Sequence, residues 1–183
     1  MEVLNQKKFR RSGYWFAILI TLTALGTSRA PAATPCPTAA NTDPVALDAT
    51  TLAGKPTSLA ALRGQTVLID VWATWCSACR TTLVAANKLA DGNQAGNLAV
   101  VGLSIDRDLE DARRWLQETL PETALRGWQA NPSETFAALD IRALPATVLL
   151  DAQGRIIARH EGSDAAGLDE LLAQARACGK TSG

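Results

Sequence analysis

Two cysteines separated by two residues stand directly after a strongly apolar stretch of the sequence. Residues 67–72 are almost entirely apolar and rich in β-branched side chains, which is typical of a strand buried on both faces. Cys76 and Cys79 follow, and a helix is predicted from Cys76 to about Ala90. Free backbone N–H groups and the helix dipole at a helix start favour a thiolate. The spacing therefore indicates dithiol–disulfide exchange, in which Cys76 attacks and Cys79 releases the product.

A zinc site is the alternative interpretation of two cysteines at this spacing. A structural zinc site needs four ligands. The sequence has no second Cys-x-x-Cys pair and no histidine near this one. We therefore predict no metal at Cys76 and Cys79, and no cofactor.

Asp70 is a carboxylate inside the predicted buried strand, six residues before Cys76. Burial disfavours the charged form of a carboxyl group and so raises its pKa. An acid of this kind can move protons for Cys79 during exchange. The alternative is an aspartate at a strand end that caps local backbone N–H groups.

Residues 1–33 have the pattern of a signal peptide or a membrane anchor. A basic segment, Lys7 to Arg11, precedes an apolar segment from Tyr14 to Leu25, and Ala30-Pro31-Ala32 is a small-x-small cleavage site. The apolar segment is shorter than the ~20 residues that cross a bilayer, but an uncleaved anchor stays open as the alternative to cleavage. Either leader would place the folded part in an oxidising compartment, where disulfides persist.

One domain is predicted after this leader. Residues 34–44 are rich in Pro, Thr and Ala and are expected to form a tether, residues 45–178 the domain and residues 179–183 a tail. The 18 basic and 18 acidic residues of the chain balance, but residues 1–32 hold five of the basic and one of the acidic residues. The remainder therefore carries a net charge of about −4. A mildly acidic body with one histidine argues against a nucleic-acid-binding protein.

Strands and helices are expected to alternate through the domain. Periodicity, turn residues and helix-start signals predict these elements. The strands are at 45–48, 67–72, 98–105, around 128, 147–150 and 155–161, and the helices at 58–62, 76–90, 110–120, 131–139 and 165–177.

Four motifs occur in a fixed order along the domain. They are Leu59-x-x-Leu62-Arg63-Gly64, Trp72-Ala73-Thr74-Trp75-Cys76-x-x-Cys79, Val101-Gly102-Leu103-Ser104-Ile105-Asp106 and Leu144-Pro145-Ala146-Thr147-Val148-Leu149-Leu150-Asp151-x-x-Gly154. With these motifs the chain resembles the thioredoxin superfamily, in its exported TlpA/ResA/DsbE-type branch, over residues 45–177. The resemblance implies a thioredoxin-like three-layer α/β/α sandwich with a mixed central sheet and an N-terminal extension.

The resemblance also implies roles for residues around the two cysteines. Pro145 matches the cis-proline of the family, which faces the active disulfide and exposes the backbone of Leu144 to an extended substrate. Leu144 departs from the small or β-branched residue that is common at its position. Trp75 is expected to cover the nucleophile and shape the docking surface, and Asp70 matches an acid of thioredoxin.

Cys36 and Cys178 lie at the two ends of the predicted domain. TlpA-type proteins can carry a structural disulfide that joins these ends, so the resemblance implies a Cys36–Cys178 bridge. The alternative is two independent thiols, one of which could pair with a partner chain.

The function implied by the resemblance is thiol–disulfide exchange on exported proteins. It would reduce disulfides of client proteins in cytochrome c or copper-oxidase assembly, with a membrane thiol reductase of the DsbD/CcdA type as electron donor. The location would be periplasmic, either soluble after signal cleavage or anchored to the inner membrane through the N-terminus.

Three other functions share this fold. A disulfide oxidase or isomerase would use the same residues at a different redox potential. A Cu(I)-binding chaperone of the Sco type would use Cys76 and Cys79 as soft ligands, but Sco proteins have a wider cysteine spacing and a dedicated histidine that His160 does not obviously match. A peroxidase of the peroxiredoxin type would need a different cysteine motif.

Overall fold

A mixed β-sheet organises the residues that the structure describes. The computed structural model describes residues 36–39, 43–92 and 96–181, so the predicted leader, residues 1–33, lies outside the described residues. Seven strands lie side by side in the order β2-β1-β5-β4-β3-β6-β7. Their bounds are β1 Asp48–Thr51, β2 Pro56–Ser58, β3 Thr66–Trp72, β4 Leu98–Ser104, β5 Arg126–Gln129, β6 Ala146–Leu150 and β7 Ile156–Glu161.

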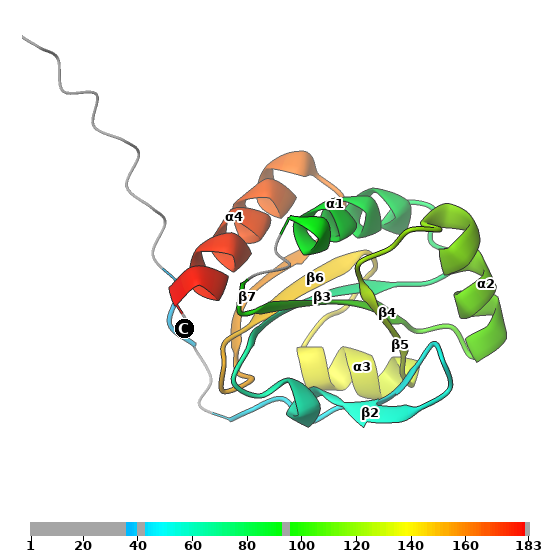
Figure 1. The fold of residues 1–183 in the computed structure, drawn as a ribbon, viewed down its shortest axis with the longest axis horizontal. Helices are drawn as coiled ribbons and strands as arrows, with labels where there is room; N and C mark the ends of the chain where they lie inside the picture. Colours follow the sequence, from blue (N-terminus) through cyan, green and yellow to red (C-terminus); the bar gives the residue numbers. More distant parts are fainter. Residues whose placement is uncertain (1–35, 40–42, 93–95, 182–183) are drawn as a thin grey trace, which may run out of the picture. The chain divides into compact units, whose positions relative to one another are not determined.

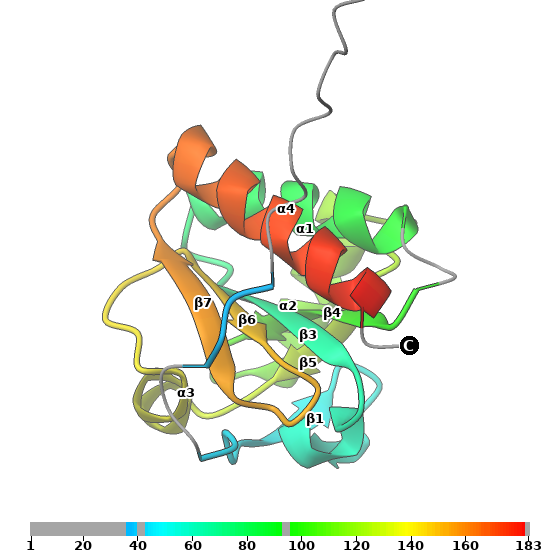
Figure 2. The same ribbon diagram turned by 90° about the vertical axis from the view of Figure 1, so that its left-hand side faces the viewer.

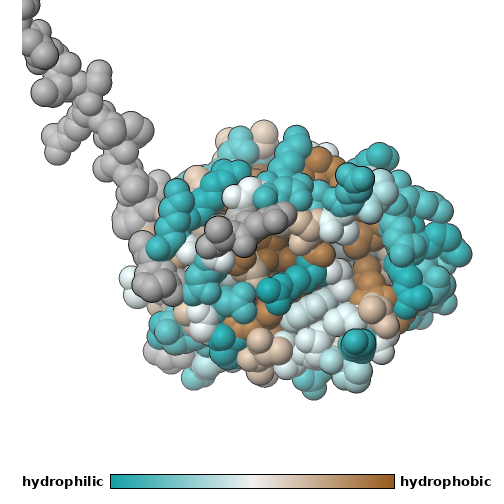
Figure 3. Space-filling view, in the orientation of Figure 1, coloured by the Kyte–Doolittle hydropathy of each residue, from teal (hydrophilic) through white to brown (hydrophobic). Residues whose placement is uncertain are grey.

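Helices cover both faces of this sheet. They are the 3-10 turn η1 Leu59–Leu62 and the helices α1 Cys79–Asp91, α2 Leu109–Thr119, α3 Pro132–Leu139 and α4 Ala165–Thr181. Helices α1 and α4 lie side by side on one face, and α3 lies on the opposite face (Figures 1 and 2). Helix α2 lies beside β5 and presents hydrophilic side chains on the right of Figure 3. The predicted three-layer α/β/α sandwich is therefore confirmed.

Strands β3 and β4 form the buried centre of the sheet. All residues of both strands are buried, as their continuous apolar sequences predict. They pair in parallel, and β6 pairs antiparallel with the other side of β3. The loops after β3 and β4 and the loop before β6 therefore meet at one edge of the sheet, which we call the carboxyl edge. This edge carries Cys76, Asp106 and Pro145.

The short first strand lies further along the chain than the sequence predicts. Strand β1 begins at Asp48, whereas residues 45–47 run beside the sheet and are held by single backbone hydrogen bonds. Val45 N donates to Gly154 O (2.8 Å), and Leu59 N donates to Leu47 O (3.0 Å). The alternation of apolar and polar residues at 45–48 therefore reflects burial of Val45 and Leu47 without strand pairing.

The last helix is longer than the sequence predicts. Helix α4 extends to Thr181 instead of ending at Ala177, so residues 179–181 of the predicted tail are helical. Asn97 N donates to Gly179 O (3.2 Å), and Cys178 is buried in a disulfide. These two tertiary contacts hold the last turn of the helix. Among the described residues, no helix is long and apolar enough to cross a membrane.

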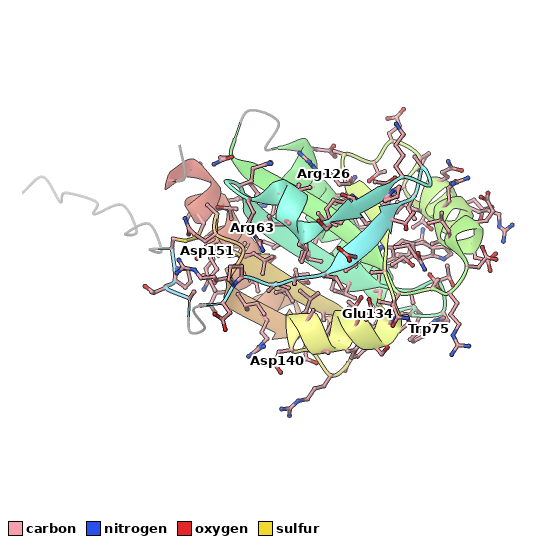
Figure 4. The ribbon with its side chains drawn as sticks, turned by 90° about the horizontal axis from the view of Figure 1, so that it is seen from below. Arg63, Trp75, Arg126, Glu134, Asp140 and Asp151 are labelled. Atoms are coloured by element: carbon pink, nitrogen blue, oxygen red, sulfur yellow. A yellow bond between two sulfur atoms is a disulfide. The ribbon has the colours of Figure 1, made fainter. Side chains whose placement is uncertain are left out.

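The Leu59–Gly64 motif shapes the end of the sheet opposite the carboxyl edge. Arg63 Nη2 donates to Val45 O (2.8 Å), and the guanidinium lies against Gly154. A Cβ atom at Gly154 would lie 1.4 Å from Arg63 Nη1, and the φ of this glycine is +79°. The positive φ favours glycine, and a side chain at this position would also displace the Arg63 guanidinium. Arg63 and Asp151 lie at the end of the molecule away from Trp75 (Figure 4).

Cys36 and Cys178 form a disulfide, the pairing that the resemblance implied. The bridge is close to the start of β4, because Gly179 accepts a hydrogen bond from Asn97, the residue before Leu98. The seven residues of β4 rise ~3.3 Å each, so the carboxyl edge is about 20 Å away. The bridge therefore constrains the chain without contributing to the carboxyl edge.

We expect the double variant Cys36→Ser/Cys178→Ser to unfold more easily than the parent protein. Cross-linking residues 142 positions apart restricts the unfolded chain, and loss of such a link costs about 2–4 kcal/mol, with ~5 kcal/mol as the limit of the chain-entropy estimate. Urea unfolding under oxidising conditions measures this difference. The reactivity of Cys76 should stay the same in the variant, and equal unfolding free energies would contradict the prediction.

Candidate functional site

Cys76 lies in a tight turn between β3 and α1. Cys76 N donates to Ala73 O (3.0 Å), and Cys79 N donates to Cys76 O (3.1 Å). The sulfur atoms of Cys76 and Cys79 are bonded to each other. Helix α1 begins at Cys79, so the predicted start at Cys76 is wrong by three residues. The reason is that these residues form a turn with hydrogen bonds between positions three apart, which leads into the helix.

The start of α1 still favours a thiolate at Cys76. Ala78 has helical dihedral angles (φ −67°, ψ −28°), and the first turn of α1 contains no acidic residue. Within the described residues, the N–H groups of Ser77 and Ala78 make no backbone hydrogen bond. Unpaired N–H groups at a helix start stabilise a nearby anion. The turn therefore keeps the property that the sequence indicated, although the helix begins later.

The two sulfur-bearing residues differ in exposure. Cys76 is 8 % exposed, whereas Cys79 is fully buried. A disulfide on another protein can therefore reach Cys76 before Cys79. Trp75, directly before Cys76, is 70 % exposed and lies at the right-hand end of the molecule in Figure 4. Trp72 is fully buried instead and stacks on Trp115, with ring centroids 4.8 Å apart.

Asp70 is fully buried on β3 and contacts elements on two sides. Thr147 Oγ1, on β6, donates to Asp70 Oδ1 (2.9 Å), and Thr82 Oγ1, on α1, lies 3.2 Å from Asp70 Oδ2. Burial raises the pKa of Asp70 to about 7, although both hydroxyl groups lower it. The Thr82 hydroxyl also lies 3.0 Å from Cys79 O. The Thr82 side chain therefore links Asp70 to Cys79, the fully buried cysteine.

Thr82 and Thr147 are candidate site residues that were not predicted from the sequence. Thr82 lies three residues after Cys79, a spacing that puts two helical residues on the same face. Thr147 pairs with Asp70 in the β3–β6 register. The helical spacing could have indicated Thr82, whereas Thr147 needed the strand register.

Pro145 and Leu144 lie at the carboxyl edge, just before β6. The Leu144–Pro145 peptide bond is cis. Glu161 Oε2 accepts hydrogen bonds from the backbone N–H groups of Arg142 and Ala143, both at 2.8 Å. Among the described residues, the N–H and C=O groups of Leu144 make no hydrogen bond. Leu144 therefore offers free backbone groups on a loop that its neighbours hold in place.

Asp106 holds the turn that carries Cys76, whereas in the sequence it stands out only as the last residue of a motif. Its buried carboxylate accepts from Thr74 N (3.0 and 3.2 Å), Thr74 Oγ1 (2.8 Å) and Ser104 Oγ (2.8 Å). Thr74 lies two residues before Cys76 and 32 residues before Asp106. Asp106 therefore joins the ends of β3 and β4 beneath the cysteine turn.

We expect Asp106→Ala to lower the free energy of unfolding by about 2–4 kcal/mol, because two partly buried donors of Thr74 and the buried hydroxyl of Ser104 lose their acceptor. Asp108→Ala is the matched control. Asp108 is the exposed N-cap of α2, and its loss should cost ~1 kcal/mol. Urea unfolding of both variants tests the difference, and equal losses would contradict a special role for Asp106.

The sequence profile of the Redoxin family matches residues 26–175 of the chain. The thiol:disulfide interchange protein DsbE of Yersinia pestis is 36 % identical over 110 residues, which are 60 % of this chain and 56 % of that protein. The DsbE of Escherichia coli strain K12 is 34 % identical over 100 residues, which are 55 % of this chain and 51 % of that protein. The chain thus spans about half the length of these curated relatives.

Solved structures show the same fold. A putative thiol:disulfide interchange protein DsbE from Chlorobium tepidum superposes with a TM-score of 0.66 and 23 % identity, over 74 % of this chain and 95 % of that chain. A secreted disulfide oxidoreductase of Mycobacterium tuberculosis superposes with a TM-score of 0.59 and 22 % identity, over 71 % of this chain and 94 % of that chain. The predicted thioredoxin-like fold is confirmed, and the chain belongs to the Redoxin family, as a DsbE-like member of the thioredoxin superfamily.

Proposed function

We propose that this protein is an exported thiol–disulfide oxidoreductase that reduces disulfides in client proteins. One observation carries the proposal. Cys76, the more exposed of the two cysteines, is bonded to the fully buried Cys79, whose helix also contacts a buried acid with a pKa of about 7. This arrangement suits an attack that begins at one cysteine and ends at the other.

The reaction begins from the dithiol form. The Cys76 thiolate attacks one sulfur of the client disulfide, so that a Cys76–client bond forms while the client disulfide breaks. The client sulfur that leaves takes up a proton from water. Cys79 then loses its proton to the Asp70 carboxylate and attacks the sulfur of Cys76. The Cys76–Cys79 disulfide forms, the second client sulfur leaves and is protonated, and two electrons have passed to the client.

The carboxyl edge supplies groups that can hold the client. The free backbone N–H and C=O of Leu144 can pair with an extended client segment as a strand would. Trp75 offers a large exposed apolar surface next to Cys76. We propose that both position the client disulfide for attack, with Pro145 fixing the backbone of Leu144.

A reductase in an oxidising compartment must be kept reduced by another protein. We propose a membrane thiol reductase of the DsbD/CcdA type as this donor, and apocytochrome c or a copper-oxidase assembly factor as client. The resemblance to exported relatives supports both assignments.

We also propose that residues 1–33 direct the domain to the periplasm, as a cleaved signal or as an inner-membrane anchor.

The redox potential of the Cys76–Cys79 pair tests the direction of transfer. Equilibration with glutathione or dithiothreitol, in the Cys36→Ser/Cys178→Ser background, isolates this pair, and Trp75 fluorescence provides the signal. We expect a potential below about −240 mV, well into the range of reductants such as thioredoxin. A value near −120 mV, that of strong oxidants, would contradict reduction and indicate a disulfide-forming enzyme.

A further inference from the structure

A groove of about 620 Å³ begins at the residue after Cys76 and runs between α1 and α4. These helices lie side by side in both ribbon views (Figures 1 and 2). Ser77 and Arg80 line the end nearest the cysteines, and Lys88 and Arg176 line the other end. The groove is therefore continuous with the turn that we assign to client capture.

The groove is positively charged although the domain is acidic. Arg80, Lys88 and Arg176 are exposed, and Asp169 is the one acidic side chain in the lining. Within the described residues, none of the three cations forms a salt bridge. Other arginines, such as Arg113, are paired with neighbouring acids. Because residues 33–183 carry a net charge of about −4, this groove is a local reversal of charge.

The dimensions of the groove fit a short extended peptide. Arg80, Val84 and Lys88 are spaced four residues apart and share one stripe of α1. The eight-residue step from Arg80 to Lys88 spans ~12 Å at 1.5 Å per residue, about the length of four extended residues. Val84 on α1 is half-buried and Leu172 on α4 is buried, so the groove combines cationic ends with an apolar lining.

We propose that this groove binds an acidic segment of the client beside its reactive cysteine, and thereby selects clients whose disulfide is flanked by Asp or Glu. The proposal rests on the function proposed above. A client attached at Cys76 brings the residues next to its cysteine within reach of Arg80, and the following residues within reach of Lys88 and Arg176. Exposed charges of this kind accelerate the encounter and are screened by salt.

Three peptides that each contain one internal disulfide test this selectivity. They differ only in a run of four residues beside one cysteine, which is all Glu, all Gln or all Lys. The reduced protein should react with the Glu peptide about 5- to 20-fold faster than with the Gln peptide at low ionic strength, and the ratio should approach one in ~0.5 M salt. The Lys peptide should be slowest.

Charge variants separate the groove from the rest of the surface. Lys88→Gln/Arg176→Gln should bring the Glu-to-Gln rate ratio close to one, and Lys88→Glu/Arg176→Glu should reverse the preference toward the Lys peptide. Lys55→Gln/Arg126→Gln removes two exposed cations outside the groove and should leave the ratio as in the parent. Reduction of a small uncharged disulfide should be the same in all variants.

The failure of this proposal differs from the failure of the proposed function. Equal rates with the three peptides, or a preference that survives in Lys88→Gln/Arg176→Gln, would overturn the groove as the binding site while exchange at Cys76 stands. No reaction of the reduced protein with any of the peptides would overturn the proposed function itself, and the groove proposal with it.

Discussion

Cys79→Ser is expected to trap the client on Cys76 as a stable mixed disulfide. Cys76 is the more exposed cysteine and Cys79 is fully buried beside it, so we expect removal of Cys79 to leave the first attack intact and to stop the second. Turnover should fall by at least about 10³-fold, because an attacking group held in the same molecule far exceeds an external thiol in effective concentration. Mass spectrometry or non-reducing electrophoresis detects the covalent complex.

Cys76→Ser is the matched control for this trap. The remaining sulfur, Cys79, is buried, so we expect no mixed disulfide and no turnover in this variant. Both variants are best compared in the Cys36→Ser/Cys178→Ser background, where no other thiol can react. A mixed disulfide that accumulates in Cys76→Ser and not in Cys79→Ser would reverse the assigned order of attack.

Asp70→Asn is expected to stabilise the oxidised protein at pH 8 and not at pH 4. The folded protein raises the pKa of Asp70 from 3.8 to about 7, so the folded form holds this proton more tightly than the unfolded chain does. The contribution of Asp70 to stability is therefore greatest below pH ~4, and it declines as pH rises toward about 7. The full difference amounts to roughly 4 kcal/mol.

Urea unfolding of the oxidised parent and the Asp70→Asn variant at pH 4, 6 and 8 measures this effect. The difference between the two proteins should grow with pH up to about 7 and then remain constant. Asp106→Asn is a control of the same size and type, and it should destabilise the protein at pH 8 because its carboxylate accepts hydrogen bonds from Thr74. A pH-independent effect of Asp70→Asn would contradict the raised pKa.

The same substitution should also slow the second step of exchange. Without a carboxylate to accept the proton of Cys79, we expect release of the client to slow by about 10²-fold at pH 7. The first step at Cys76, followed in the Cys79→Ser background, should be unchanged by Asp70→Asn. Equal slowing of both steps would indicate that Asp70 acts by holding the structure instead of moving a proton.

Local sequence patterns determined most of the elements around the site. The apolar runs at 67–72 and 98–105 became β3 and β4, because a strand covered on both faces needs apolar side chains at every position. Pro132 follows an asparagine that caps α3, and both are residues that a helix start prefers. These signals lie within a few residues of the element they specify, so the sequence displays them directly.

The sequence placed the boundaries less well where tertiary contacts decide them. The last turn of α4 extends beyond the predicted end because a disulfide and a backbone hydrogen bond from distant segments hold it. Helix α1 begins later than predicted because Cys76 and Cys79 form a local turn with hydrogen bonds between positions three apart. Helix propensity differs by less than ~1 kcal/mol between most residues, so one tertiary contact can shift where a helix begins or ends.

The sequence by itself predicted the pair Cys76 and Cys79, which the structure shows bonded, because their spacing along the chain limits how far apart the sulfur atoms can lie. Only the tertiary structure decided which of the two cysteines is more exposed and what surrounds them. Asp70 receives its hydroxyl contacts from positions 12 and 77 residues away, and Asp106 holds Thr74 from 32 residues away. Burial, and with it the pKa of Asp70, depends on how the sheet and helices pack together, which no short segment of the chain contains.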